Sequence, residues 1–283
     1  IKAILINMNF YIIPSPIGNL DDITFRSIQV LRELDILIVE NKQKSKIILE
    51  KYDIKPQNIL TYNDKSTEKD RKKIINLLKN SSSGGLMSEA GTPLISDPGF
   101  KLINELINLK VKIIPLPGAT SVISSLVASG LPTNHFQFIG FFPRNKKDAQ
   151  SLSESLLSFD GTTIIFESPK RIINTLNFLD QMFGDLAEVC VAKEITKIHE
   201  DFFRGTAKEI EEFLLENQDL IKGEFVILIK VANQDESFIL ADKMYHQLSS
   251  KLSLKDLSKL ASEITGISKN KIYERFLSFS QKS

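Results

Sequence analysis

Short apolar runs rich in β-branched residues alternate along most of the chain with longer stretches of helical spacing. Residues 24–34 are an example of the second kind, because their apolar positions recur every three or four residues at Phe25, Ile28, Leu31 and Leu34. Strands that alternate with helices in this way are typical of an α/β architecture.

The first half of the pattern predicts strands separated by helices. The expected strands cover 10–14, 35–40, 58–62 and 111–116, and the expected helices cover 24–34, 44–52, 68–80 and 100–108. Residues 81–85, Ser-Ser-Ser-Gly-Gly, are interpreted as a loop before Leu86 and Met87, since such clusters favour loops.

A second series of elements begins after the break at Gly130-Leu131-Pro132-Thr133. It predicts strands at 136–142, 162–166, 187–193, 201–204 and 224–231, and helices at 146–158, 170–183 and 207–216. Helices separate these strands less regularly, so we expect a mixed sheet. The predicted domains are therefore 8–132 and 133–233, followed by a third piece at 234–283.

The third piece is basic and helical. From residue 243 to 283, eight basic and three acidic side chains give a local net charge of +5. Apolar faces recur at Leu254, Leu257, Ala261 and Ile264, and at Ile272, Tyr273, Phe276 and Leu277, with Gly266 and Ser268 at the break between the two helices. The pattern indicates a helix-turn-helix-like tail with a basic surface; a plain helical appendage with solvated lysines is the alternative.

Composition narrows the function classes only slightly. The 283 residues are 42% hydrophobic and 25% charged with a net charge of +1, so any nucleic-acid partner must be argued from local patches. The one cysteine, Cys190, lies in an apolar run and is read as a core residue. A single cysteine forms no intrachain disulfide, which fits a cytoplasmic protein.

The N-terminal run has no expected structural role. The apolar residues after Lys2 are too few for a signal peptide or a membrane span, and Asn7 and Asn9 interrupt them. We interpret residues 1–7 as a leader or an alternative start that the fold does not need.

Three loops rich in glycine and proline each follow an apolar strand. They are Pro16-Ile17-Gly18-Asn19, Ala90-Gly91-Thr92-Pro93 and Pro117-Gly118-Ala119-Thr120-Ser121. Ligands of α/β sheets bind outside the carboxyl ends of the strands, so the loops point to one small-molecule crevice. Neither a Gly-x-Gly-x-x-Gly nor a Gly-x-x-x-x-Gly-Lys motif is present, which favours a neutral or cationic ligand over a dinucleotide or nucleoside triphosphate.

Long motifs in order along the chain resemble the tetrapyrrole methylase superfamily, in particular the branch that contains ribosomal RNA small subunit methyltransferase I. They are Pro14-Ser15-Pro16-Ile17-Gly18-Asn19-Leu20, Ser88-Glu89-Ala90-Gly91-Thr92-Pro93, Pro115-Leu116-Pro117-Gly118-Ala119, Phe166-Glu167-Ser168-Pro169, Lys193-Glu194-Ile195-Thr196-Lys197 and Lys222-Gly223-Glu224-Phe225. The likeness runs from about Met8 to the C-terminus.

The resemblance implies two α/β domains with S-adenosylmethionine in the cleft between them, a small C-terminal helical domain and a homodimer. The implied reaction is 2′-O-methylation of a decoding-centre cytidine in 16S ribosomal RNA of the small subunit, without a metal. The implied cofactor-binding residues are Gly18, Ala90, Gly91, Thr92, Pro93, Gly118, Thr120, Ser121, Glu194 and Gly223.

Some positions depart from the family pattern. Glu-Asp-Thr-Arg after the second strand appears as Glu40-Asn41-Lys42-Gln43, and the histidine-rich stretch after the third strand is replaced by residues 62–67. Ser-Asp-Ala-Gly-Thr-Pro carries Glu89, which lengthens the acid by one methylene. These changes bear on substrate positioning and catalysis more than on cofactor binding.

A ribose hydroxyl needs a base or an oxyanion stabiliser before it attacks a methyl group. Glu40, Glu89 and Glu167 are the candidate bases, with a structural carboxylate as the alternative for each; His199 is a weaker candidate, ahead of His135 and His246. Arg144, Arg171 and Lys197, with Lys146 and Lys147, are candidate phosphate contacts that would position RNA.

Three functions stay open at this stage. The first is an RNA 2′-O-methyltransferase, and the second is a methylase of a small tetrapyrrole-like molecule, against which the basic tail argues. The third is a degenerate homologue that binds the cofactor or the ribosome without turnover, as the changes at 41–43 and 62–67 suggest.

Overall fold

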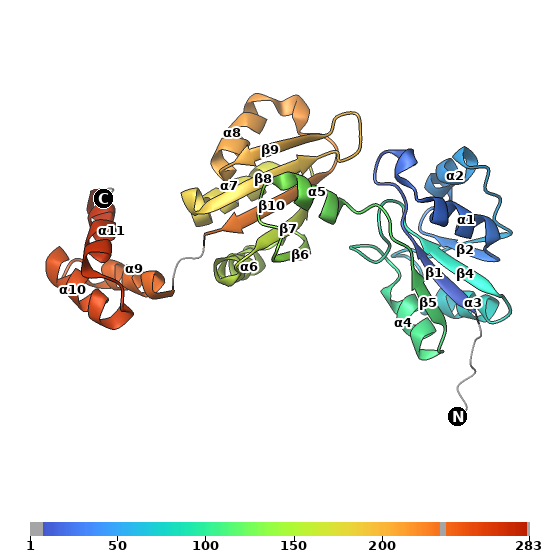
Figure 1. The fold of residues 1–283 in the computed structure, drawn as a ribbon, viewed down its shortest axis with the longest axis horizontal. Helices are drawn as coiled ribbons and strands as arrows, with labels where there is room; N and C mark the ends of the chain where they lie inside the picture. Colours follow the sequence, from blue (N-terminus) through green and yellow to red (C-terminus); the bar gives the residue numbers. More distant parts are fainter. Residues whose placement is uncertain (1–7, 233–235, 282–283) are drawn as a thin grey trace. The chain divides into compact units, whose positions relative to one another are not determined.

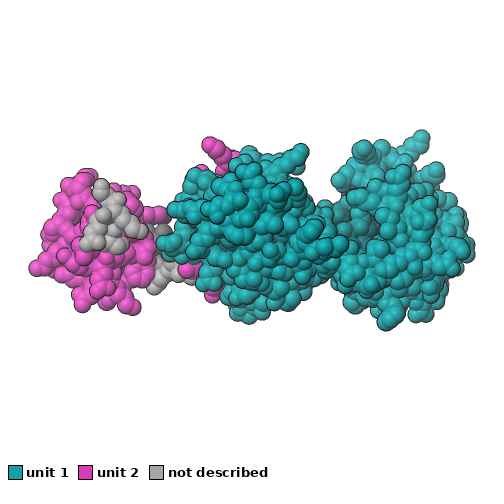
Figure 2. Space-filling view, turned by 90° about the horizontal axis from the view of Figure 1, so that it is seen from above, with its two compact units in different colours: residues 1–145, 161–230 teal, residues 146–160, 231–283 magenta. Residues whose placement is uncertain are grey.

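A computed structural model of the chain describes residues 8–232 and 236–281. By their contacts, residues 1–145 and 161–230 form one compact unit, and residues 146–160 and 231–283 form a second (Figure 2). The predicted leader at 1–7 and the start of the predicted tail at 234–235 lie outside the described residues.

The first sheet of the larger unit is parallel in every pairing, with the strand order β3-β2-β4-β1-β5 (Figure 1). Its strands are β1 (Asn9–Ile13), β2 (Ile36–Val39), β3 (Asn58–Thr61), β4 (Ser83–Met87) and β5 (Lys112–Pro115). The connections contain η1 (Leu20–Asp22), α1 (Phe25–Glu33), α2 (Lys42–Lys51), α3 (Glu68–Leu78) and α4 (Phe100–Asn108). The predicted α/β alternation is confirmed here.

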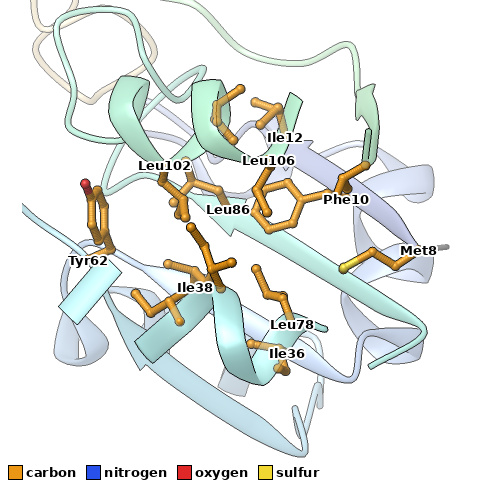
Figure 3. Close-up of a cluster of buried hydrophobic side chains, with 14 residues drawn as sticks. Met8, Phe10, Ile12, Ile36, Ile38, Tyr62, Leu78, Leu86, Leu102 and Leu106 are labelled. Carbon is orange, nitrogen blue, oxygen red and sulfur yellow. The ribbon is translucent and has the colours of Figure 1, made fainter. Parts of the chain in front are cut away.

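Side chains from both faces of this sheet are buried, as the continuous apolar runs of its strands require. On one face Phe10, Ile38 and Leu86 pack with Leu78 of α3 and Leu106 of α4 (Figure 3). The alternate residues of the same strands, which include Ile13, Leu37 and Met87, pack on the other face with Leu31, Ile48 and Leu49 of α1 and α2.

The prediction of a loop at 81–85 was wrong, because Ser83, Gly84 and Gly85 belong to β4 at the centre of the sheet. A Cβ at Gly84 would lie 2.6 Å from Leu78 Cδ2, and one at Gly85 would lie 2.8 Å from Ile13 Cδ1 and from Leu34 Cδ1. These glycines therefore make room for large neighbours on both faces, a tertiary demand that local composition does not reveal.

The second sheet is mixed, as predicted, with the order β6-β7-β10-β8-β9. β6 and β7 pair in parallel, whereas β7 with β10 and β8 with β9 pair antiparallel. Its strands are β6 (Phe136–Phe141), β7 (Thr162–Glu167), β8 (Ala187–Lys193), β9 (Asp201–Gly205) and β10 (Phe225–Val231). The helices are α5 (Ser121–Ser129), α7 (Ile172–Phe183), η2 (Gly184–Leu186), α8 (Ala207–Glu216) and η3 (Gln218–Leu220). Cys190 is fully buried in β8, as expected.

The sequence pattern did not predict α5, since four of its nine residues are serines. It buries Val122 and Leu126 in the core of the second sheet, together with the hydroxyls of Ser125 and Ser129. Each of these hydroxyls donates to a carbonyl three residues earlier, so both polar groups are satisfied.

The smaller unit contains α6 (Lys146–Ser158), α9 (Glu236–Leu248), α10 (Leu254–Thr265) and α11 (Lys269–Gln281). Its apolar cluster joins Ala241 of α9, Leu257 and Ala261 of α10, and Ile272 and Phe276 of α11. The two predicted tail helices are confirmed, and Gly266 ends the first of them with φ +75°. α9 was not predicted, and Ile264 and Leu277 are exposed although their spacing placed them on the apolar faces.

No helix among residues 8–232 and 236–281 has the length and apolarity that a membrane crossing requires.

We expect Gly85→Val to destabilise the larger unit by about 1–3 kcal/mol, because the new side chain must displace Ile13 and Leu34 from a packed core. Urea denaturation should show a lower midpoint than for the wild type. The matched control is Asn9→Val, which adds a β-branched residue to an exposed strand position. Equal midpoints for the two variants would contradict this account of β4.

Candidate active site

The three glycine- and proline-rich loops meet, as the sequence predicted, because β4, β1 and β5 are neighbours in the sheet. Ser15 and Gly91 exchange two backbone hydrogen bonds of 2.9 and 3.0 Å, and Ser15 Oγ donates to the carbonyl of Ser88. Thr92 Oγ1 donates to the carbonyl of Ala119 at 3.2 Å. Each loop is thus fixed to its neighbour through backbone atoms.

A cavity of about 260 Å³ opens beside these loops and is walled on the other side by the second sheet. The first sheet supplies the lining residues Ile17, Ala90, Gly91, Thr92, Ile95, Ser96, Asp97, Thr120 and Ser121. The second sheet and its loops supply Phe141, Phe166, Glu167, Ile195, Glu224, Phe225 and Val226. Polar backbone and hydroxyls therefore face aliphatic and aromatic side chains across one cavity.

The loop after β4 carries unusual backbone geometry. Gly91, Leu94 and Ser96 have φ values of +75°, +77° and +64°, and Leu94 and Ser96 are not glycines. Left-handed conformations of such residues cost free energy and persist where the surroundings impose them, often at functional sites. A Cβ at Gly91 would lie 3.2 Å from Ile17 Cγ2.

Asp97 is the least satisfied polar group of the cavity. Its Oδ2 is buried and has no hydrogen-bond partner. Burial raises the pKa of the Asp97 carboxyl from 3.8 to about 6, and the negative charge of Glu40 adds to the shift. A buried acceptor without a partner costs free energy, so it suits a ligand that brings a donor or a positive charge.

Two of the predicted bases lie beside Asp97 and do not line the cavity. Burial and the neighbouring charge of Glu89 raise the pKa of Glu40, whose Oε2 accepts from the Glu89 amide at 3.4 Å. Lys44 Nζ donates to the carboxylate of Glu89. The longer acid at position 89 is thus matched by a lysine from α2, and Asn41 caps that helix by accepting from Gln43 and Lys44 amides.

The third predicted base, Glu167, lines the cavity but is fully engaged. Its buried carboxylate accepts from Arg171 Nε and Nη2, both at 2.8 Å, from the Ser168 amide at 2.7 Å and from Thr175 Oγ1 at 2.6 Å. Arg171 Nη2 also donates to the carbonyl of Phe142. This network ties β6, β7 and α7 together and leaves Glu167 little capacity to accept a further proton.

Several predicted cofactor residues lie beside the cavity rather than on its wall. Gly18 and Glu194 line a second, open hollow together with Lys197 and His199. A Cβ at Gly18 would lie 2.4 Å from Lys197 Cγ, and one at Gly223 would lie 2.2 Å from Glu194 Cδ. Both glycines allow close contact between loops, which shapes the neighbouring cavity.

The remaining predicted residues differ in their environment. Gly118 packs on Pro14, where a Cβ would lie 2.5 Å away, and Pro93 follows the lining residue Thr92. Arg144 is exposed, Lys197 is paired with Glu194 and Glu224, and Arg171 is held by Glu167. His199 and His135 are exposed, and His246 stacks on Phe279 in the smaller unit.

Sequence reasoning missed Asp97, Phe141 and Glu224 as cavity residues. Asp97 lies just after the motif Ser88-Glu89-Ala90-Gly91-Thr92-Pro93, and its chemistry becomes apparent only from its placement between Glu40 and the cavity. Among the described residues, no group of three or more His, Cys, Asp or Glu is placed to hold a metal ion.

Solved structures define the class of fold. The chain matches diphthine synthase with a TM-score of 0.62 and 14% identity over 80% of this chain and 90% of that one. Uroporphyrin-III C-methyltransferase of Thermus thermophilus, solved with S-adenosylhomocysteine, matches with a TM-score of 0.54 and 14% identity over 78% and 97% of the chains. The fold is that of the methyltransferases with two α/β sheets.

Family models and sequence relatives give the particular family. Residues 9–211 match the tetrapyrrole (corrin/porphyrin) methylases, and residues 235–280 match the RsmI C-terminal HTH domain. Ribosomal RNA small subunit methyltransferase I of Rickettsia prowazekii is 40% identical over 91% of both chains, and that of Bacillus subtilis is 32% identical over 94% of this chain and 93% of its own. The chain belongs to the tetrapyrrole methylase family, in the branch of these relatives.

Proposed function

We propose that the chain transfers the methyl group of S-adenosylmethionine to a ribose 2′-hydroxyl of ribosomal RNA. The observation that carries the proposal is the likeness to ribosomal RNA small subunit methyltransferase I over more than nine-tenths of this chain and of the relatives, C-terminal helices included. The helical tail argues against a small tetrapyrrole-like substrate, because the solved cobalt precorrin-4 and uroporphyrin-III methyltransferases cover only 79% and 78% of this chain.

The cavity residues fit a cationic cofactor that has a flat ring. Asp97 Oδ2 lacks a partner, and the backbone at Gly91 leaves room that a Cβ would fill. Ala90, Gly91, Thr92, Thr120 and Ser121 offer backbone and hydroxyl contacts, while Ile17, Ile195 and Val226 offer an apolar surface. When bound, S-adenosylmethionine supplies a methyl group on a positively charged sulfur. We propose Pro93, Gly18, Gly118, Glu194 and Gly223 as supports of this site.

Asp97 is the proposed base. In its ionised form Asp97 Oδ2 can accept the proton of the 2′-hydroxyl, and bound S-adenosylmethionine would supply the methyl group and leave as S-adenosylhomocysteine. After burial itself, the negative charges of Glu40 and Glu89 raise the pKa of Asp97, and Lys44 Nζ pairs with the Glu89 carboxylate. Glu167 binds Arg171, which also donates to the carbonyl of Phe142. These bonds stabilise the wall of the cavity that the second sheet provides.

The proposed partners are the small ribosomal subunit and a second copy of the chain. The RNA is 16S RNA in the small ribosomal subunit, and the target is a cytidine of the decoding centre. Arg144, Lys197 and Arg171 are the proposed phosphate contacts, Lys197 by exchanging a carboxylate for phosphate and Arg171 while it stays bound to Glu167. We also propose a cytoplasmic homodimer; the exposed Ile123 and Val127, one turn apart on α5, support a protein contact there.

Tritiated S-adenosylmethionine and unmodified 30S subunits test the reaction. We expect label in 16S RNA, with kcat/KM rising as the pH rises to about 6 and levelling above, because Asp97 acts only when deprotonated. Asp97→Asn should lower kcat by roughly 10²- to 10⁴-fold. Clear cofactor binding without label in wild-type reactions would favour a binding homologue without turnover.

Deleting residues 235–283 should weaken binding to 30S subunits and reduce its salt dependence, since the segment carries the basic helices. Arg275 contributes less than the lysines, because Asp242 neutralises it through two hydrogen bonds of 2.7 and 2.6 Å. Calorimetry with S-adenosylhomocysteine should give nearly the wild-type affinity. A large loss of cofactor affinity would overturn the assignment of this segment to RNA.

A further inference from the structure

The phenyl ring of Phe141 lies at the cavity and is not buried in the hydrophobic core. It lines the cavity, and 59% of the residue is exposed, whereas Phe225 on the same wall is 2% exposed. The Phe141 ring lies 5.7 Å from that of Phe166 at 70°, an edge-to-face arrangement that leaves a ring face open.

An irregularity in β6 directs this ring. Phe138 pairs with Ile164 and Phe141 pairs with Phe166. Between these two pairs β6 advances by three residues and β7 by only two, which is a β-bulge in β6. Phe138 and Phe141, three residues apart, would point to opposite faces of a regular strand, yet both rings contact Phe166. Gly140, with φ +75°, lies within this bulge. Bulges of this kind re-aim a side chain next to active sites.

The residues across the cavity from Phe141 decide which part of a bound nucleotide its ring could contact. Gly140 approaches the loop of Ser96, where a Cβ would lie 3.7 Å from Ser96 Oγ. Asp97, with its unpartnered Oδ2, lines the same cavity as Phe141. A nucleotide whose ribose hydroxyl meets Asp97 therefore brings its base to the rim of the cavity, where Phe141 stands.

We propose that Phe141 is the stacking platform for the base of the nucleotide that is methylated. The inference rests on the proposed RNA methyltransferase function and assigns to that site a residue that holds the target base. Any base of a single-stranded nucleotide can stack on an exposed aromatic face, so such a face next to the cavity can hold the base while the ribose lies in the cavity. The rim position distinguishes this ring from Phe225, which is buried against the inner part of the cavity.

The test compares Phe141→Leu, Phe141→Trp and wild type in methylation of unmodified 30S subunits and in filter binding to the same particles. Because stacking of one base on an aromatic ring contributes about 1–3 kcal/mol, Phe141→Leu should weaken particle binding and raise the KM for 30S roughly 5- to 100-fold. Phe141→Trp should stay within about threefold of wild type, since it keeps an aromatic face.

Phe136→Leu is the matched control, because Phe136 is 43% exposed on the same strand and does not line the cavity. It should leave the KM and the binding unchanged. Calorimetry with S-adenosylhomocysteine should give the same affinity for Phe141→Leu as for wild type.

Two results would overturn the inference. The first is a Phe141→Leu variant that binds 30S subunits as wild type does. The second is a loss of S-adenosylhomocysteine affinity in that variant, which would assign the ring to the cofactor's adenine. Failure of the proposed function itself appears separately, as wild-type protein that transfers no label; filter binding then still decides the role of Phe141.

Discussion

The site depends on one constraint, the position of β1 between β4 and β5 in a parallel sheet. Carboxyl ends of parallel strands lie on one edge, so the loops that follow these three strands must meet there. The two backbone hydrogen bonds between Ser15 and Gly91 then join residues that are 76 positions apart in the sequence. From this junction the loop after β4 continues through the left-handed residues Leu94 and Ser96 to Asp97.

The charges around the cavity divide into satisfied and unsatisfied groups. Glu167 is neutralised and saturated by Arg171, Ser168 and Thr175, so it stabilises the wall. Glu89 is paired with Lys44, which offsets the loss of an arginine at position 43. Asp97 alone of the cavity's described carboxylates retains a buried oxygen without a partner, and burial raises its pKa to about 6, near the range in which a general base works at neutral pH. The departures from the family pattern therefore leave the Asp97 carboxylate in the wall of the cavity.

Much of this was accessible from the sequence. Periodicity predicted the alternating strands and helices of the first sheet, the mixed second sheet and two tail helices, and loop composition predicted the ligand crevice. The wrong predictions have tertiary causes. Gly84 and Gly85 have the local composition of a loop, but they lie in a strand because only glycine leaves room for Leu78 and Leu34 to pack there. The serines of α5 look like a loop until their hydroxyls bond to the helix carbonyls. Asp97 and Phe141 could not be chosen in advance, because a pKa shift and a bulge arise only from folded neighbours.

The central claim is that the junction at Gly91 forms the cofactor site. Calorimetric titration with S-adenosylhomocysteine of wild type and Gly91→Val tests it most directly, because the added side chain would press on Ile17 Cγ2 at 3.2 Å or less in a backbone with φ +75°. The account predicts saturable binding by wild type and a loss of at least roughly 100-fold in the variant, equivalent to about 2.8 kcal/mol. Unchanged affinity in a folded Gly91→Val protein would contradict it.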